Sequence, residues 1–498
     1  MNVNPITRLD YPDLDVIRVE DTYYMVSTTM HFMPGCEILQ SFDLVHWEHA
    51  TYVYETLDHT DAQQLKSGQN IYGQGMWAAS LRYHEGRFYI CFVANDTRKT
   101  YLYTSEKIDG PWKKQLIEGF YHDGSLLFDE DGRNYIVYGN DEIWITELNE
   151  DLTAPKKDGL HRLLVSDHKN PELGYEGSHI QKINGYYYIF LVHSLRDRWM
   201  RTEACFYSDS LEGEFTGGDV LCDDRGYCGQ GVAQGGIVDT PDGKWYAMLF
   251  QDSGAVGRLP ILLPVTWKDH FPVFGQNGHV PEEIEVHSTR PGYIYQPLVG
   301  SDDFCNGLLP RWQFNHDPDP RYYHLDALQG TYTITTREVC TELTQAVNTL
   351  TQRMSYPSCA AEVTVDASAL KEGDVAGLCA LQGCYAAVGI TKHHGKYEVL
   401  MLDKKEDGIL DMTEGTVVES HQMDFRLEAD FCNMKDEARC YYRVNKGDWL
   451  PIGTVHKLYF KLDHFTGCRF GLFCYAAEET GGSACFRDFK YYDVDEIS

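Results

Sequence analysis

The chain has 498 residues, with 43 Lys or Arg against 75 Asp or Glu and a formal net charge of −32. This length allows about two or three domains, each with its own core. Nucleic acid and anionic membranes would repel so acidic a chain, so we expect neither as a partner. A neutral ligand such as a sugar is compatible with the charge.

The N-terminal segment MNVNPITRLDYPD lacks the basic and apolar regions of a signal peptide. No apolar stretch is long enough for a transmembrane helix, for which about 18 residues are needed. We therefore expect a cytoplasmic protein. The fifteen cysteines follow no paired spacing, which favours reduced thiols over disulfides or a zinc site.

The first three hundred residues repeat a unit made of a β run, a turn and an aromatic β run. Its five copies begin at Val16, Leu81, Leu126, His179 and Ile237, and their matching tyrosines are Tyr24, Tyr89, Tyr135, Tyr188 and Tyr246. A period near 50 residues, built of four-strand units, is typical of a β-propeller, and five copies predict five blades. A series of hairpins in a sandwich is the alternative, but a sandwich does not need this regular spacing.

Eleven or twelve residues before each tyrosine, one position recurs at the start of the innermost strand. Its occupants are Asp13, Trp77, Asp123, Glu176 and Gln234. Inner strands line the axis of a propeller, so these side chains should converge at one end of the channel. Buried carboxylates are unfavourable unless they are paired or used. Three carboxylates beside an indole and an amide suit a sugar, and two acids flanking a sugar can hydrolyse a glycosidic bond while a third tunes the proton of one of them.

The pattern changes between Gly292 and Asp303, which predicts a propeller over 1–295 and a second domain over 303–498. Short alternating runs there predict a β-sandwich of the jelly-roll or concanavalin-like kind. The runs are 331–336, 360–367, 385–391, 396–402, 425–431, 439–444, 458–465 and 469–476. For this sandwich, packing that closes one side of the propeller mouth is favoured over a separate sugar-binding role.

Three segments resemble the motifs of glycoside hydrolase family 43: NPITRLDYPDLDVIRV (4–19), HDGSLLFDEDG (122–132) and GYEGSH (174–179). The resemblance implies Asp13 as general base, Asp123 as the residue that modulates the pKa of the acid, and Glu176 as general acid. Three motifs in this order, each at the same place in its blade, are far more specific than one alone.

Further segments are similar to the same family. GMWAASLRYHEGRFY (75–89) implies Trp77 as a platform for the sugar, and VGRLPILLPVTW (256–267) places Arg258 on the substrate near the acid. HFMPG (31–35) implies that Phe32, and with it His31, lines the sugar pocket. Segments 346–353, 369–382 and 485–492 resemble the C-terminal sandwich of the β-xylosidase branch.

The resemblance implies an inverting exo-glycosidase that releases terminal xylose or arabinofuranose from oligosaccharides. Inversion predicts a separation of about 6.5–9.5 Å between Asp13 and Glu176, with room for a water molecule. No cofactor is needed for this chemistry. Gln234, expected to contact the substrate, stands where many members carry a histidine that helps to hold a calcium ion, so the sequence leaves a structural calcium open.

Other functions stay open at this point. A carbohydrate-binding propeller without turnover, and a glycosidase of other pentose- or galactose-containing glycans, share the same features. A fructose-acting five-bladed enzyme also shares the architecture, but the Asn-Asp-Pro-Asn and Arg-Asp-Pro signals for it are absent from the sequence. The sequence is compatible with a homo-oligomer and does not decide between xylose and arabinose.

Overall fold

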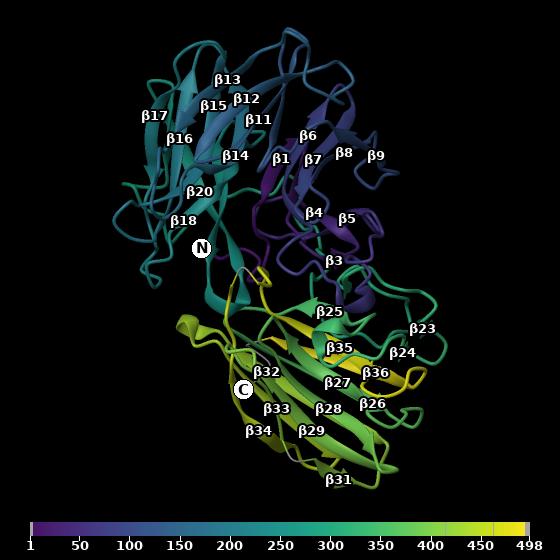
Figure 1. Ribbon diagram of the computed structural model, residues 1–498. Coiled ribbons are helices and arrows are strands. Elements are labelled where there is room, and N and C mark those ends of the chain that lie inside the picture. Colours follow the sequence, from purple (N-terminus) through teal and green to yellow (C-terminus); the bar gives the residue numbers. More distant parts are fainter. Residues whose placement is uncertain (1–2, 414, 462, 494–498) are drawn as a thin grey trace.

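Five four-stranded antiparallel sheets of consecutive strands form the N-terminal body of the computed structural model, which describes residues 3–413, 415–461 and 463–493 (Figure 1). This arrangement confirms the predicted five-bladed propeller. The blades are β1 (Asp15–Val19), β2 (Thr22–Ser27), β4 (Gly35–Ser41) and β5 (Glu48–Tyr54); β6 (Met76–His84), β7 (Arg87–Ala94), β8 (Lys99–Ser105) and β9 (Lys113–Ile117); β10 (Ser125–Phe128), β11 (Asn134–Asn140), β12 (Glu142–Leu148) and β13 (His161–Ser166); β14 (Glu176–Ile183), β15 (Tyr186–Ser194), β16 (Arg201–Ser208) and β17 (Thr216–Leu221); and β18 (Val232–Asp239), β19 (Trp245–Asp252), β20 (Arg258–Lys268) and β21 (Phe271–Phe274).

The five repeated hairpins of the sequence are the two inner strands of each blade. In blade 4, Asn184 and Gly185 turn the chain between β14 and β15 with φ values of 51° and 85°. Two consecutive positive φ values are what a two-residue hairpin turn of type I′ requires, and Asn-Gly supplies them at low cost. Glu85 and Gly86 do the same in blade 2, with φ values of 47° and 77°.

Apolar contacts between neighbouring blades hold the ring together. A separate buried cluster fills each of the five blade-to-blade contacts. Blade 1 packs on blade 5 through residues such as Val16 and Phe250. The segment before β1 also bonds to blade 5, because the amide of Tyr11 donates to the carbonyl of Arg258. Each inner strand remains an edge of its own sheet, but the ring protects these short edges around the axis.

Two packed sheets form the C-terminal body, which confirms the predicted sandwich. The first sheet has the order β3 (Phe32–Met33), β22 (Gln313–Asn315), β25 (Leu350–Arg353), β35 (Arg469–Ala476), β27 (Asp374–Leu381), β28 (Ala386–His393), β29 (Lys396–Lys404) and β30 (Leu410–Met412), with β31 (Thr416–Val418) also on β29. The second has the order β23 (Tyr323–Asp326), β24 (Thr331–Thr335), β36 (Ser483–Asp493), β26 (Ser358–Asp366), β32 (Gln422–Asp430), β33 (Glu437–Val444) and β34 (Leu450–Lys457). Four single-turn 3₁₀ helices are η1 (Lys66–Gly68), η2 (Gly254–Val256), η3 (Leu343–Gln345) and η4 (Cys432–Met434).

Two exchanges join the bodies. Strand β3 comes from the propeller half of the sequence, yet it pairs with β22 at the edge of a sandwich sheet. In the other direction, the run 458–465 was predicted as a strand, and this prediction is wrong: its described residues form a loop. Its continuation is anchored on the propeller, where Cys468 N donates to Ala255 O over 2.8 Å. The loop is irregular because its aromatic side chains pack against the propeller rather than inside the sandwich.

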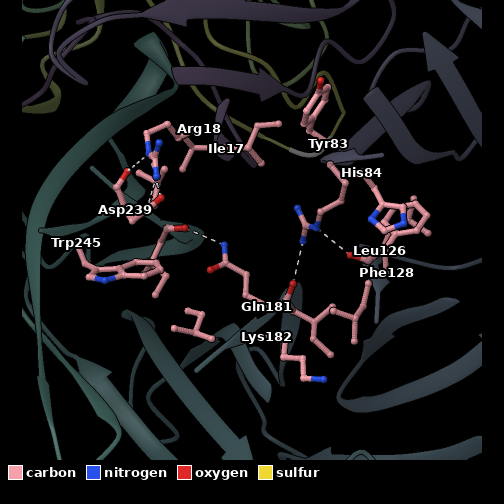
Figure 2. Close-up of a pocket in the computed structure, with 17 residues that line it drawn as sticks. Ile17, Arg18, Tyr83, His84, Leu126, Phe128, Gln181, Lys182, Asp239 and Trp245 are labelled. Carbon is pink, nitrogen blue, oxygen red and sulfur yellow. Dashed lines mark hydrogen bonds and ion pairs between the residues drawn. The ribbon is translucent and has the colours of Figure 1, made fainter. Parts of the chain in front are cut away.

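The inner strands have two ends, and each end opens into a different region. The C-terminal ends surround a hollow of about 410 Å³ whose lining includes Arg18, Gln181 and Trp245 (Figure 2). The N-terminal ends carry the five positions singled out in the sequence. All fifteen cysteines lie among the described residues and are free thiols. In the described part of the chain, no helix has the length and apolar character to cross a membrane.

Candidate active site

The structure brings the five predicted positions together at one end of the channel. The amide nitrogen Nε2 of Gln234 donates to Oδ1 of Asp13 over 3.1 Å, and the backbone amide after Glu176, that of Gly177, donates to Oδ2 of Asp123 over 2.9 Å. A Cβ at Gly177 would lie 2.8 Å from Cγ of Gln234, so only glycine fits there with the amide in place. The repeat therefore locates a real cluster of side chains.

An unusual backbone conformation accompanies this position in every blade. Asp13, Asp123 and Gln234 have φ values of 51°, 48° and 66°, while in the other two blades the next residue, Ala78 or Gly177, has a φ of 37° or 64°. Residues other than glycine rarely adopt this left-handed conformation, because it costs about 1–2 kcal/mol per residue. Strained backbone of this kind concentrates at functional sites, and here it turns the side chains toward the axis.

Asp13 lies in a network of guanidinium groups. Nη1 of Arg258, which the resemblance places on the substrate near the acid, lies 3.0 Å from Oδ1 of Asp13. Nε of Arg258 also contacts Asp252 at 3.3 Å, and the other carboxylate oxygen of Asp252 accepts from Nε of Arg201 at 2.8 Å. These contacts fix the Asp13 carboxylate in one orientation while its second oxygen has no hydrogen bond to the described residues.

Glu176 and Asp123 share a third neighbour that the sequence analysis did not single out. Nε2 of His122 lies 3.5 Å from Oε2 of Glu176 and 3.6 Å from Oδ2 of Asp123. Oε2 of Glu176 also accepts from Nδ2 of Asn140 over 2.8 Å. One imidazole thus lies between two carboxylates, and its charge controls how protons distribute over all three groups.

The pKa values in this group of three shift in different directions. The charge of Asp123 raises the pKa of His122 to about 9. Burial, reinforced by the nearby charges of Glu176 and Asp13, raises the pKa of Asp123 to about 6. Burial acts the same way on Glu176, but the hydrogen bond and charge of His122 outweigh it and lower the pKa of that carboxyl. Without substrate, the additional proton therefore favours Asp123 over Glu176.

The donors around Gln234 do not fit a calcium ion. Its amide nitrogen donates to Asp13, and its amide oxygen faces Nη1 of Arg201 at 3.5 Å. A divalent cation there would meet the Arg201 and Arg258 guanidiniums, and calcium prefers oxygen ligands without competing positive charge. Ligand atoms of His122, Asp123 and Glu176 do lie within 4.8 Å of one another, but the imidazole, with its raised pKa, already supplies the positive charge there.

Trp77 and the sandwich loop form an aromatic wall over the carboxylates. The ring of Phe465 lies 5.2 Å from that of Trp77, and the guanidinium of Arg258 lies 4.4 Å from the Phe465 ring. Asp10 fixes this loop, since its two carboxylate oxygens accept from the amides of Arg258 and Gly467, each over 2.8 Å. The sandwich thus closes one side of the propeller mouth, as predicted. Trp77 keeps a buried Nε1 with no partner among the described residues, a donor that a ligand could use.

Phe32 and His31 lie elsewhere. Both are 0% exposed and pack in the contact between the two bodies. The Arg469 guanidinium covers the Phe32 ring at 3.4 Å, while the His31 ring lies 4.8 Å from that of His316 and 5.0 Å from that of His464. With no exposed surface, neither side chain could touch a sugar in this arrangement. This placement corrects the prediction that they line the pocket.

A buried layer directly beneath the site links four blades. Asp15, fully buried, accepts from Nη1 of Arg82 over 2.6 Å and lies 3.1 Å from Nδ1 of His179. The Arg82 guanidinium also donates to the hydroxyl of Ser125 over 2.7 Å and to the carbonyl of Ile180 over 3.1 Å. Every strong donor here has a partner, so this layer supports the site rather than offering it a ligand.

Sequence reasoning missed His122, Asn140, Arg201, Asp252 and Phe465. His122 stands next to Asp123 in the motif HDGS, which was the one local signal available. Asn140 and Asp252 are the last residues of strands β11 and β19, and Arg201 is the first residue of β16. The repeated sequence pattern marks the start of the innermost strand of each blade, so it does not point to these three positions. Phe465 lies in the second domain, and no spacing connects it to the first.

Comparison with known proteins agrees with this architecture. Residues 3–272 match Glycosyl hydrolases family 43, and residues 301–492 match the Beta xylosidase C-terminal Concanavalin A-like domain. A beta-xylosidase of Formosa agariphila is 26% identical, over 99% of this chain and 89% of its own. A xylosidase/arabinosidase of Butyrivibrio fibrisolvens is 24% identical over 99% of both chains.

Solved structures share the whole fold. A bifunctional GH43-CE protein of Bacteroides eggerthii superimposes with a TM-score of 0.92 at 42% identity and covers 99% of this chain, which spans 64% of that protein's chain. A GH43 glycoside hydrolase, whose engineered active site displays both endo-xylanase and exo-arabinofuranosidase activity, gives a TM-score of 0.86 at 27% identity over 99% of each chain.

Proposed function

Because the chain belongs to Glycosyl hydrolases family 43, and is a glycoside hydrolase, we propose that it removes a terminal xylose or arabinofuranose from short oligosaccharides with inversion at the anomeric carbon. The observation that carries this proposal is the convergence of three carboxylates from three blades at one end of the axis. The names of its relatives, a beta-xylosidase and a xylosidase/arabinosidase, support the sugar class.

In the proposed reaction, Asp13 acts as the general base. Its carboxylate takes a proton from a water molecule as the water oxygen bonds to the anomeric carbon. The contacts with Arg258 and Gln234 orient Asp13 so that one oxygen remains for the water. Glu176 donates a proton to the leaving oxygen as the glycosidic bond breaks, and the products are the inverted sugar and the shortened chain.

Glu176 must carry a proton before it can donate one, and the free site favours Asp123 instead. We infer that the bound sugar reverses this order. A sugar ring over Glu176 expels water, and loss of water raises the pKa of a carboxyl group. Nε2 of His122 lies next to both carboxylates, so His122 can give a proton to Glu176 and take one from Asp123 at that moment. On this scheme Asp123 tunes the acid by holding its proton until substrate binds.

Two measurements test the proposal. Proton NMR during hydrolysis of a β-xyloside should show α-xylose as the first product, since inversion changes the anomer. Rates on nitrophenyl β-xylopyranoside and nitrophenyl α-arabinofuranoside should then identify the preferred sugar. Release of the β anomer first would contradict inversion. If the protein bound oligosaccharides but hydrolysed none of them, the result would favour a carbohydrate-binding propeller without catalytic activity.

A further inference from the structure

The chain leaves the regular ladder of blade 5 at Gln234. The register between β18 and β19 shifts after Ala233 and resumes at Gly236, so Gln234 and Gly235 form a β-bulge. Gln234 is 4% exposed and has a φ of 66°. A bulge removes ladder partners from the backbone, and a buried amide without a partner is costly. The backbone amide of Gln234 therefore needs an acceptor from outside its own sheet.

Glu203 of blade 4 supplies this acceptor. Its Oε2 accepts from the backbone amide of Gln234 over 2.7 Å, while its Oε1 has no hydrogen-bond partner among the described residues. Glu203 is 0% exposed, and burial raises the pKa of its carboxyl well above the usual range, so the group is a neutral acid at pH 7. A buried acid is unfavourable unless it is paired or used, and the hydrogen bond to Gln234 is its use here.

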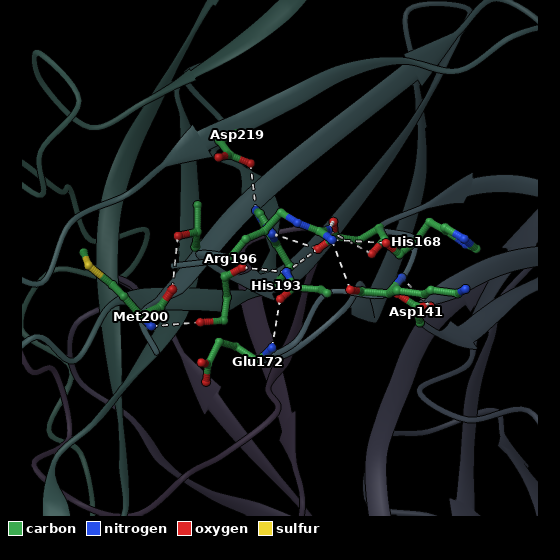
Figure 3. A network of polar contacts seen from close by, with 12 residues as sticks. Asp141, His168, Glu172, His193, Arg196, Met200 and Asp219 are labelled. Atoms are coloured by element: carbon green, nitrogen blue, oxygen red, sulfur yellow. Dashed lines mark hydrogen bonds and ion pairs between the residues drawn. The ribbon is translucent and has the colours of Figure 1, made fainter. Parts of the chain in front are cut away.

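The strand that carries Glu203 is clamped by both of its neighbours. Glu203 lies in β16, opposite Val192 of β15. The next residue of β15, His193, reaches across β16, and its Nε2 lies 2.8 Å from Oδ1 of Asp219 in β17 (Figure 3). Nδ1 of the same ring lies 3.2 Å from Oδ2 of Asp167. An acceptor on a strand fixed in this way can hold the bulge of the next blade in one conformation.

The side chain of Gln234 makes the second half of the connection. Its Nε2 donates to Oδ1 of Asp13 over 3.1 Å. A bulge re-aims the side chain that it carries, so the conformation of this backbone decides whether the amide reaches Asp13. Glu203 thus holds Gln234 by its backbone, and Gln234 holds Asp13 by its side chain.

Two other blades use the same device with different acceptors. The Thr28 hydroxyl accepts from the backbone amide of Ala78 over 2.8 Å, and Asp123 accepts from that of Gly177 over 2.9 Å. Each acceptor comes from the blade before, as Glu203 does. The hydroxyl in blade 1 is neutral, so the device requires an acceptor and not a negative charge.

We propose that Glu203 is a positioning residue for the general base: through the backbone of Gln234, it fixes the amide that orients Asp13. The inference rests on the proposed function in one respect, because Asp13 acts as a base only in that reaction. Glu203 touches no substrate in this role and moves no proton. Its contribution is one accepted hydrogen bond, so a residue that keeps an acceptor at this point keeps the role.

The test removes this acceptor and follows the pH profile of activity. Hydrogen bonds favour the charged form of a carboxyl group, and two or three of them lower its pKa by about two units. Glu203→Met frees Gln234 to withdraw from Asp13, so the acid limb of the kcat/KM profile, which reports protonation of the base, should move upward by about 0.5–1 pH unit. Glu203→Gln keeps a carbonyl acceptor and should keep the acid limb of the wild type. If Glu203→Met does not fold, Glu203→Asp, which draws the acceptor back by one methylene, should move the limb in the same direction.

Two comparisons separate positioning from general damage. Thr28→Val removes the equivalent acceptor in blade 2, so it should lower the urea midpoint as Glu203→Met does, yet leave the acid limb in place. In a Gln234→Met background, Glu203→Met should move the limb no further, because the two residues act through one contact. The inference would be overturned by an unmoved acid limb in folded Glu203→Met, by a further shift in the double variant, or by equal shifts in Glu203→Met and Glu203→Gln.

Crystal structures of the Glu203 variants decide the geometry without turnover. Nε2 of Gln234 should lie beyond hydrogen-bond reach of Asp13 in Glu203→Met and within reach in Glu203→Gln. An unchanged contact in Glu203→Met would overturn the inference. A wild-type protein that hydrolyses no glycoside would instead overturn the proposed function, and the crystal structures would still decide the placement of Gln234, so the two failures are distinguishable.

Discussion

The two ends of the propeller channel are built from the same five strands but treat charge differently. At the end of the carboxylates, ionisable groups share partners: Asp252 serves both Arg201 and Arg258, and His122 serves both Glu176 and Asp123. Shared partners leave several charge states close in energy, which proton-transfer chemistry requires.

At the opposite end, the two basic side chains nearest the surface are paired with carboxylates of the turns beside them. Arg18 pairs with Asp239, and Lys182 pairs with Asp129. The hollow there (Figure 2) has a volume of about 410 Å³, against about 290 Å³ for the hollow beside the carboxylates that Arg201 and Arg258 line. The comparison teaches that shared partners among charged groups, rather than the size of a cavity, distinguish the end of the channel that we propose as the active site.

The largest difference in activity between the two ends should appear when one carboxylate at each end is replaced by its amide. Glu176→Gln removes the proposed proton donor and should lower kcat on xylobiose by about 10²–10⁴-fold, the usual contribution of a general acid. Nitrophenyl glycosides need less acid assistance and should lose far less. Asp239→Asn, the control at the opposite end, should change neither rate. Equal losses on both substrates in Glu176→Gln would contradict its role as acid.

Between the two ends, Arg82→Met should cost stability. Burial favours a raised pKa for Asp15, but Arg82 and His179 outweigh it and hold that pKa at about 2. A pKa lowered on folding stabilises the protein above the ordinary value of about 3.8, and this contribution is lost as the pH falls through 2. Removing Arg82 takes a positive charge away from the buried carboxylate of Asp15. This loss should lower the free energy of unfolding at pH 7 by about 3–5 kcal/mol.

Urea unfolding of Arg82→Met across this pH range provides the measurement. The difference from wild type should be greatest near neutral pH and shrink in acid as Asp15 protonates. Arg18→Met is the matched control, since its pair with Asp239 is partly exposed and such pairs contribute about 0–1 kcal/mol. A loss in Arg82→Met that stayed constant with pH would show that packing, not charge, is responsible.

His122→Asn should shift the pH profile of kcat/KM more than it lowers the maximal value of kcat/KM. The positive charge of His122 lowers the pKa of Glu176 and opposes the rise in the pKa of Asp123. Without it, both carboxyls hold their protons to higher pH, so the alkaline limb of the kcat/KM profile should move upward. His84→Asn, a histidine stacked on Phe128 at the opposite end, should leave the profile in place. A downward shift in His122→Asn would contradict the assignment.

The smallest expected effect concerns calcium. Gln234 faces guanidinium groups rather than free oxygens, so a chelator should leave kcat/KM unchanged and added calcium should not raise it. A wild-type enzyme that loses activity in EDTA and regains it with calcium would show that a cation holds these charges in balance after all.

Much of this architecture could be predicted because its signals are local. Asn184-Gly185 sets a hairpin whatever surrounds it, and five such units at a regular period imply a closed ring. The inner positions Asp13 and Glu176 followed from counting along that repeat. The run 458–465 was wrongly predicted as a strand because its apolar and polar residues do alternate. Phe460 and Phe465, however, contact Arg258 of the propeller rather than a sandwich core. Contacts between distant segments override local pattern at such places.

Strand β3 has a consequence for how this protein can be inherited and recombined. Phe32 and Met33 close the edge of a sandwich sheet, while Phe465 of the sandwich completes a wall of the propeller. A gene fragment carrying either body alone would produce an open sheet edge or an incomplete catalytic mouth. A chimera that joins this propeller to a foreign sandwich should therefore fail unless β3 and the loop around Phe465 are exchanged together. The two bodies therefore depend on each other structurally, although their sheets are separate.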